Sequence, residues 1–187
     1  DLQGRFWAGT MKDRGKSECK GSFYCLDQNK KVNKWKNGIW TTNGLAFSPD
    51  GEYMYFSDSN PRVQKIWVSK YNNDTGIPDK PKFFFDANCL NGHPDGATVD
   101  ADGCYWFAGI DGWEIYQISP NGKLLQTIKV PVEKPTKPIF GGTNLDILYF
   151  TSTSINLINP EKQPQAGCVF SITGLHSKGI PQIRYQG

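Results

Sequence analysis

The sequence contains Gly51-Glu-Tyr-Met-Tyr-Phe-Ser-Asp58, a turn glycine followed at once by an aromatic-rich run. The same pattern recurs at Gly4-Arg-Phe-Trp-Ala-Gly-Thr10 and Gly103-Cys-Tyr-Trp-Phe-Ala-Gly109, and a looser copy reads Leu145-Asp-Ile-Leu-Tyr-Phe-Thr-Ser152. A period of about 40 to 50 residues made of short strands is typical of the blades of a β-propeller. The repeat therefore predicts an all-β fold.

A second strand is expected after each aromatic run. The four candidate segments are residues 22–26, 65–69, 113–118 and 168–172. Acidic turns that end in Gly51 and Gly103 introduce two of the aromatic runs, and such turns join antiparallel strands because Asp bonds its own backbone and glycine supplies a positive φ. The chain thus reads as roughly four units of about four strands, the anatomy of propeller blades.

The composition fits this prediction and excludes several classes of protein. The chain has 187 residues, of which 37% are hydrophobic and 13% aromatic, so it is able to bury a sizeable core. Twenty Gly and twelve Pro favour many strands joined by turns over a few long helices. The formal charge is only +3 and the lysines are dispersed, so nucleic acid is not an expected partner.

Other motifs are absent from the sequence. The five cysteines are odd in number and lack zinc-binding spacing, which favours a reducing, cytoplasmic location over a disulfide scaffold. No apolar stretch approaches the roughly 20 residues that span a bilayer, so no membrane partner is expected. The lack of GxSxG, HExxH and phosphate-binding glycine motifs argues against serine hydrolases, zincins and nucleotide-dependent enzymes.

The start of the chain predicts an incomplete first blade. Asp1 occupies the place that Ser48 and Asp100 hold in the later copies, so the strand expected at residues 42–47 has no counterpart ahead of it. Because blades bury their faces by closing a ring, we expect residues 1–187 to form a single propeller domain that lacks its N-terminal blades. The alternative is an authentic N-terminus that begins at a turn.

One pair of polar residues shares a position in the repeat. The offset of 52 residues that aligns Gly51 with Gly103 also places Asn43 on Asp95. The first strand of each blade lines the central channel, so the two side chains should face one another. Amide and carboxylate oxygens suit a hard divalent cation such as Ca²⁺. The alternative is that Asn-Gly and Asp-Gly are merely turn-forming pairs.

Taken together, these segments resemble the senescence marker protein, gluconolactonase and regucalcin-like family, which also includes luciferin-regenerating enzyme. The segments that carry the resemblance follow in family order over essentially the whole chain: Gly4-Arg-Phe-Trp-Ala-Gly-Thr-Met11, Asn43-Gly-Leu-Ala-Phe-Ser-Pro-Asp-Gly51, Pro94-Asp-Gly-Ala-Thr-Val-Asp-Ala-Asp-Gly103, Phe140-Gly-Gly142 and Lys178-Gly-Ile180.

The resemblance implies a six-bladed β-propeller, of which this chain supplies about four blades. It also implies one divalent metal in the channel, with Ca²⁺ favoured and Zn²⁺, Mn²⁺ or Mg²⁺ open, held by a Glu, an Asn and an Asp. Asn43 and Asp95 match two of these ligands, whereas the Glu and a substrate-binding Arg-x-Asn segment belong to sequence before Asp1.

The implied activity is hydrolysis of a sugar lactone. The metal would polarise the lactone carbonyl as a Lewis acid, and Asp95 or a metal-bound water would supply the base or nucleophile. Met11 and Thr136 fall at substrate-contacting positions of the family. Lys137 stands where the family usually has a small residue, so it leaves open which lactone is bound.

Two other functions remain open from the sequence. One is a calcium-binding or regulatory propeller without turnover. The other is a catalytically inert fragment, because an oxygen-ligand site without its Glu has one charge fewer to offset dehydration of the cation.

Overall fold

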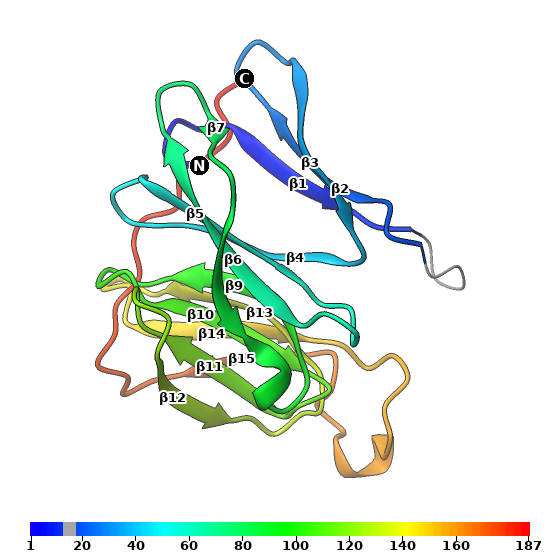
Figure 1. Cartoon of the computed structure of the whole chain (residues 1–187). Coiled ribbons are helices and arrows are strands. Elements are labelled where there is room, and N and C mark those ends of the chain that lie inside the picture. The colour runs from blue at the N-terminus through cyan, green and yellow to red at the C-terminus, as the bar shows by residue number, and fades with distance from the viewer. Residues whose placement is uncertain (13–17) are drawn as a thin grey trace.

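The aromatic repeats fold into antiparallel sheets in the computed structural model, which describes residues 1–12 and 18–187 (Figure 1). The strands β1 (Phe6–Thr10), β5 (Tyr53–Asp58), β10 (Tyr105–Ile110) and β14 (Ile147–Ser152) are the four aromatic runs. The all-β prediction from the repeat is confirmed, since the helices in the described residues are two single 3₁₀ turns, η1 (Ala87–Cys89) and η2 (Pro160–Lys162).

Four sheets follow one another along the described chain. The first holds β1, β2 (Gly21–Leu26) and β3 (Val32–Ile39). The second holds β4 (Thr42–Phe47), β5, β6 (Lys65–Asn72), β7 (Ile77–Pro78) and β8 (Lys82–Asp86). The third holds β9 (His93–Val99), β10, β11 (Glu114–Ile118) and β12 (Leu124–Lys129), and the fourth β13 (Pro135–Gly141), β14 and β15 (Val169–Ile172).

The leading strands of three sheets lie side by side. Strand β9 packs against β4 on one side and β13 on the other. This is the arrangement of the inner strands of propeller blades, which line a common channel. The first sheet begins instead with β1, the counterpart of β5 and β10, and the described residues include no strand on its inner edge equivalent to β4 or β9.

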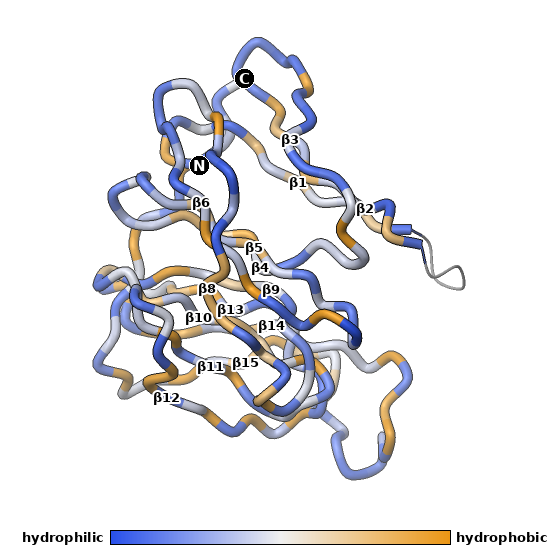
Figure 2. Tube along the Cα trace, in the orientation of Figure 1, coloured by the Kyte–Doolittle hydropathy of each residue, from blue (hydrophilic) through white to orange (hydrophobic). Residues whose placement is uncertain are grey.

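Alternate residues of the aromatic strands fill the spaces between neighbouring sheets. Tyr105 and Phe107 pack toward the second sheet with Tyr55, whereas Trp106 packs toward the fourth sheet with Phe140. Successive strand residues point to opposite faces, so one aromatic run supplies the core on both sides of its blade. Apolar residues accordingly recur along the central strands, while most hairpin loops are hydrophilic (Figure 2).

The C-terminal segment runs along one side of the molecule (Figure 1) and hydrogen-bonds to three sheets. It accepts a hydrogen bond from Ala101 N, donates one from Gly179 N to Leu145 O and donates another from Gln186 N to Gly4 O. The three partners lie in the turns that precede β10, β14 and β1. The opposite ends of the inner strands, where Asn43 and Asp95 lie, are therefore not the ends that this segment crosses. No helix in residues 1–12 and 18–187 could span a lipid bilayer.

Candidate functional site

A β-bulge places Asn43 at the start of β4. Asn43 pairs with Ser57 and Ala46 with Tyr55, so β4 advances three residues while β5 advances two. The extra residue falls at Gly44, whose φ of 64° is the left-handed conformation that glycine adopts without strain. Bulges re-aim side chains and are enriched next to functional sites.

A second β-bulge lies at Asp95 in β9. Pro94 pairs with Gly109 and Ala97 with Phe107, so Asp95 and the glycine after it share one position of β10. The repeat offset that aligned Asn43 with Asp95 therefore aligned two bulges on neighbouring inner strands.

A third bulge lies at Thr136 in β13. Pro135 pairs with Ser152 and Lys137 with Thr151, which leaves Thr136 as the additional residue. The Thr136 hydroxyl shares a 2.7 Å hydrogen bond with that of Thr151. All three predicted inner-strand positions thus lie at bulges near the start of adjoining strands.

Ser59 fixes the side chain of Asn43. Asn43 Nδ2 donates to Ser59 Oγ at 2.9 Å, and the Ser59 hydroxyl donates to the carbonyl of Pro94. Ser59 is only 7% exposed, so its hydroxyl is a buried bridge between the second and third sheets. This hydrogen bond holds the Asn43 amide in place beside β9. Ser59 is not among the residues predicted from the sequence.

Ser59→Ala is expected to destabilise the chain by about 1 to 2 kcal/mol, because it removes the two hydrogen bonds by which the buried hydroxyl joins Asn43 to the Pro94 carbonyl. Urea unfolding of this chain measures the change. Ser57→Ala is the matched control, since Ser57 is fully buried but its hydroxyl has no hydrogen-bond partner in the described residues. Its removal should be close to neutral, and equal losses for the two variants would contradict the bridge.

Asp95 is half-buried and carries a perturbed carboxyl group. Desolvation raises the pKa of Asp95 from 3.8 to about 6, with the Asp111 carboxylate raising it further. The Asn43 side chain and the Lys137 ammonium act in the opposite direction and favour the charged form. The effect of Asn43 shows that the two predicted ligands lie close together across β4 and β9.

Lys137 lies beside Asp95 on the neighbouring strand and donates from Nζ to the carbonyl of Ala97. Its pKa is lowered from 10.5 to about 8 by desolvation, against which the Asp95 carboxylate raises it. Much of the side chain is nevertheless exposed, so solvent screens its interaction with Asp95.

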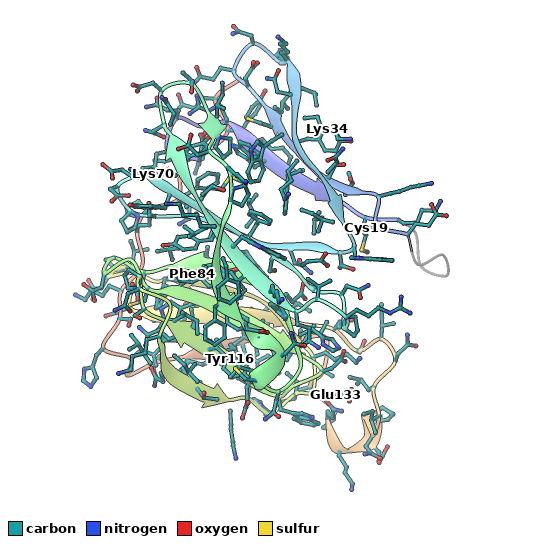
Figure 3. All side chains as sticks on the ribbon, in the orientation of Figure 1. Cys19, Lys34, Lys70, Phe84, Tyr116 and Glu133 are labelled. Atoms are coloured by element: carbon teal, nitrogen blue, oxygen red, sulfur yellow. The ribbon has the colours of Figure 1, made fainter. Side chains whose placement is uncertain are left out.

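An ionic cluster borders the site at the same end of the strands. His93 Nε2 lies 3.6 Å from Asp111 Oδ2, and Lys134 Nζ donates to the other oxygen of Asp111. Lys134 also lies 3.6 Å from Glu133, a buried carboxylate that accepts hydrogen bonds from Ile158 N and the Gln163 side chain (Figure 3). The cluster fastens the loop that follows β14 to the start of β13.

The backbone of Met11 pairs with the chain just ahead of Asn43. Met11 forms an antiparallel bridge with Thr41, two residues before Asn43, and its side chain is 51% exposed. Met11 thus lies at the same end of the inner strands as Asn43, whereas the prediction that it contacts substrate stays a prediction.

The donor atoms suit a hard cation. The Asn43 amide oxygen and the Asp95 carboxylate are ligands of the kind that Ca²⁺ takes, and the Ser59 bridge holds the Asn43 amide in place. Within residues 1–12 and 18–187, no three His, Cys, Asp or Glu side chains gather as a metal cluster. Asn43 and Asp95 therefore fit part of a cation's ligand set, and the other ligands would come from outside this pair.

Residues 1–154 match the family model described as the SMP-30/Gluconolactonase/LRE-like region. The chain belongs to this family. Relatives in the SMP-30/gluconolactonase family include the 6-deoxy-6-sulfogluconolactonase of Pseudomonas putida, 36% identical over 192 residues and covering 100% of this chain and 64% of the relative. The regucalcin of Danio rerio is 35% identical over 191 residues, with the same shares covered.

Solved structures of the family share the fold. A luciferin-regenerating enzyme superposes with a TM-score of 0.90 at 33% identity, over 100% of this chain and 63% of its own. A structure described as a calcium-binding protein, regucalcin, from Agrobacterium tumefaciens str. C58 gives a TM-score of 0.89 at 30% identity, over 98% of this chain and 61% of its own. The fold is thus that of the six-bladed regucalcin-type propeller. The chain spans 64% of the length of the curated relatives it matches.

Proposed function

We propose that the protein containing this chain hydrolyses a sugar lactone with the help of one divalent cation bound at Asn43 and Asp95. The observation that carries the proposal is the pair of bulges at which Asn43 and Asp95 lie on adjoining inner strands. The names of two relatives support it, since one is a 6-deoxy-6-sulfogluconolactonase and another is described as a calcium-binding protein.

The reaction adds water to the lactone carbonyl carbon, breaks the bond from that carbon to the ring oxygen, and yields a hydroxy acid. A bound cation would polarise the carbonyl as a Lewis acid. Asp95 would take the proton of the attacking water, because a carboxylate positioned beside that water is able to act as a general base. Thr136 and Met11 would contact the sugar from the neighbouring walls.

Removal of the cation tests the mechanism. The full-length protein is expected to hydrolyse aldonolactones, to lose that activity in excess chelator and to regain it when Ca²⁺, Mn²⁺, Zn²⁺ or Mg²⁺ is added back. A pH-indicator assay of acid release measures the rate. Full activity after exhaustive removal of metal would contradict the mechanism.

A calcium-binding protein without turnover is the second candidate, favoured by the description of the Agrobacterium tumefaciens structure. Cation binding combined with no hydrolysis over a broad panel of lactones would support it.

This chain by itself is expected to bind Ca²⁺ weakly or not at all. Asp95 is the single carboxylate of the pair, and few ligand charges give a Ca²⁺ site low affinity. Titration calorimetry of residues 1–187 checks this, and tight binding by this chain in isolation would contradict it.

A further inference from the structure

We propose that Lys137 recognises an anionic group on the lactone, so that the preferred substrate carries a carboxylate, sulfonate or phosphate at a distance from its reacting carbonyl. The inference rests on the proposed lactonase function and names the substrate class of the same site.

Lys137 packs closely on Gly96, the glycine that follows Asp95. A Cβ atom placed on Gly96 would lie 2.6 Å from Lys137 Cδ, 3.0 Å from Lys137 Cβ and 2.8 Å from the Thr136 carbonyl oxygen. The lysine stem therefore lies directly on the bare backbone of Gly96. The glycine that forms the Asp95 bulge is also the glycine that accommodates the lysine.

The path of the side chain carries its charge along the inner strand away from Asp95. Lys137 Nζ donates to the carbonyl of Ala97, which lies beyond the Asp95 bulge on β9. Lys137 also lines a cavity of about 410 Å³, together with residues such as Ala97 and Ile180. The cavity extends from Lys137 toward the C-terminal segment and is not lined by Asn43 or Asp95. A substituent that reaches past Asp95 along the inner strands would therefore enter it beside the ammonium.

The ammonium of Lys137 is free to pair with a ligand. Within the described residues it forms no salt bridge, in contrast to Lys134, which is paired with both Asp111 and Glu133. The Asp95 carboxylate interacts electrostatically with Lys137 and raises its pKa. Once Asp95 serves as a cation ligand, its charge offsets that of Lys137 less, and an anionic substituent would pair with the ammonium.

The test compares lactones that differ only in charge. For the full-length protein, kcat/KM is measured on a neutral aldonolactone and on the same lactone bearing a carboxylate, a sulfonate or a phosphate at its far end. Because a hydrogen bond to a charged group contributes about 1.5 to 3 kcal/mol, we expect a preference of roughly 10- to 100-fold for the anionic lactones, expressed mainly in KM. The three substituents also distinguish which anion fits best.

Two variants assign the preference to Lys137. Lys137→Met keeps an unbranched stem on Gly96 without the charge, so the ratio of kcat/KM for anionic over neutral lactones should fall close to one. Lys137→Arg keeps the charge and should retain most of that ratio. Lys123→Ser, a change of an exposed lysine in the turn before β12, is the matched control and should keep the full preference. Unfolding curves establish that each variant is folded.

Calorimetric binding of the hydroxy-acid products gives a second measurement that needs no turnover. The anionic product should bind at least about tenfold more tightly to the unaltered protein than to Lys137→Met. Lactone hydrolysis without any charge preference would overturn this inference and leave the lactonase proposal standing. If the protein bound the anionic product through Lys137 but hydrolysed no lactone, the lactonase proposal would be overturned and the anion-binding role of Lys137 would stand. If neither hydrolysis nor Lys137-dependent binding were found, both proposals would be overturned.

Discussion

Asp95→Asn is expected to stabilise the metal-free chain by about 1 to 2 kcal/mol at pH 7.5 and to give no such gain near pH 4. Folding raises the pKa of Asp95 from 3.8 to about 6, mainly by desolvation. Below the unfolded pKa the carboxyl is protonated in both states and imposes no penalty. As the pH rises through about 6 the folded protein must hold a desolvated charge, so stability is lost. A shift of about two units sets a ceiling near 3 kcal/mol, and solvent at this half-buried position reduces it.

Urea unfolding of residues 1–187 between pH 4.5 and 8 measures the effect, with Asp79→Asn as the control. Asp79 is an exposed carboxylate away from the channel, so its replacement should give no pH-dependent gain. A constant difference between Asp95→Asn and the unaltered chain over this range would mean that the carboxylate is not desolvated in the folded state.

The same substitution should abolish the proposed activity. In the full-length protein Asp95→Asn removes both a cation ligand and the proposed base, and we expect kcat/KM for lactones to fall by at least about 10³-fold. A residue that lowers stability in the absence of ligand yet is needed for activity is placed for function and not for folding. Greater stability together with retained hydrolysis would show that Asp95 takes no part in the reaction.

Much of the fold follows from local sequence pattern. The aromatic runs at Tyr105–Ile110 and Tyr53–Asp58 form the predicted strands because alternate side chains fill the core on both faces of each blade. The offset of 52 residues also placed Asn43 and Asp95 at equivalent positions of adjoining inner strands, as the repeat predicted. Both inferences needed only the order of residues along one strand.

Other features depend on contacts between strands that the order of residues does not specify. The bulges at Asn43 and Asp95 become visible only when the pairing with β5 and β10 is known, although the glycine that follows each residue was a signal. The bridge from Ser59 to Pro94 joins two blades, and no spacing within either blade indicates it. The sequence likewise left the direction of the Lys137 side chain open, because it depends on the empty space over Gly96.

Asp100 is a buried carboxylate that organises the turn between β9 and β10. It is fully buried, and its Oδ1 atom accepts hydrogen bonds from Asp102 N at 3.1 Å and Cys104 N at 2.8 Å. Its Oδ2 atom accepts from the Trp106 indole at 2.8 Å and from the Gln117 amide at 3.2 Å. One side chain thus closes the turn, orients a core tryptophan and reaches the next strand, β11.

Asp100→Ala is expected to destabilise the chain by about 3 to 5 kcal/mol. It leaves several buried hydrogen-bond donors without an acceptor, and each unpaired donor costs about 1 to 3 kcal/mol. Asp100→Asn should also be costly, since its NH₂ group would face a donor on Trp106 or on the backbone of Cys104. Asp102→Ala removes an exposed carboxylate from the same turn and should change stability by less than about 0.5 kcal/mol. Urea unfolding followed by tryptophan fluorescence measures all three variants. If Asp102→Ala lowered the free energy of unfolding as much as Asp100→Ala, the stabilising effect would belong to the turn sequence in general. The buried Asp100 carboxylate would then have no special part in holding the turn, Trp106 and β11 together.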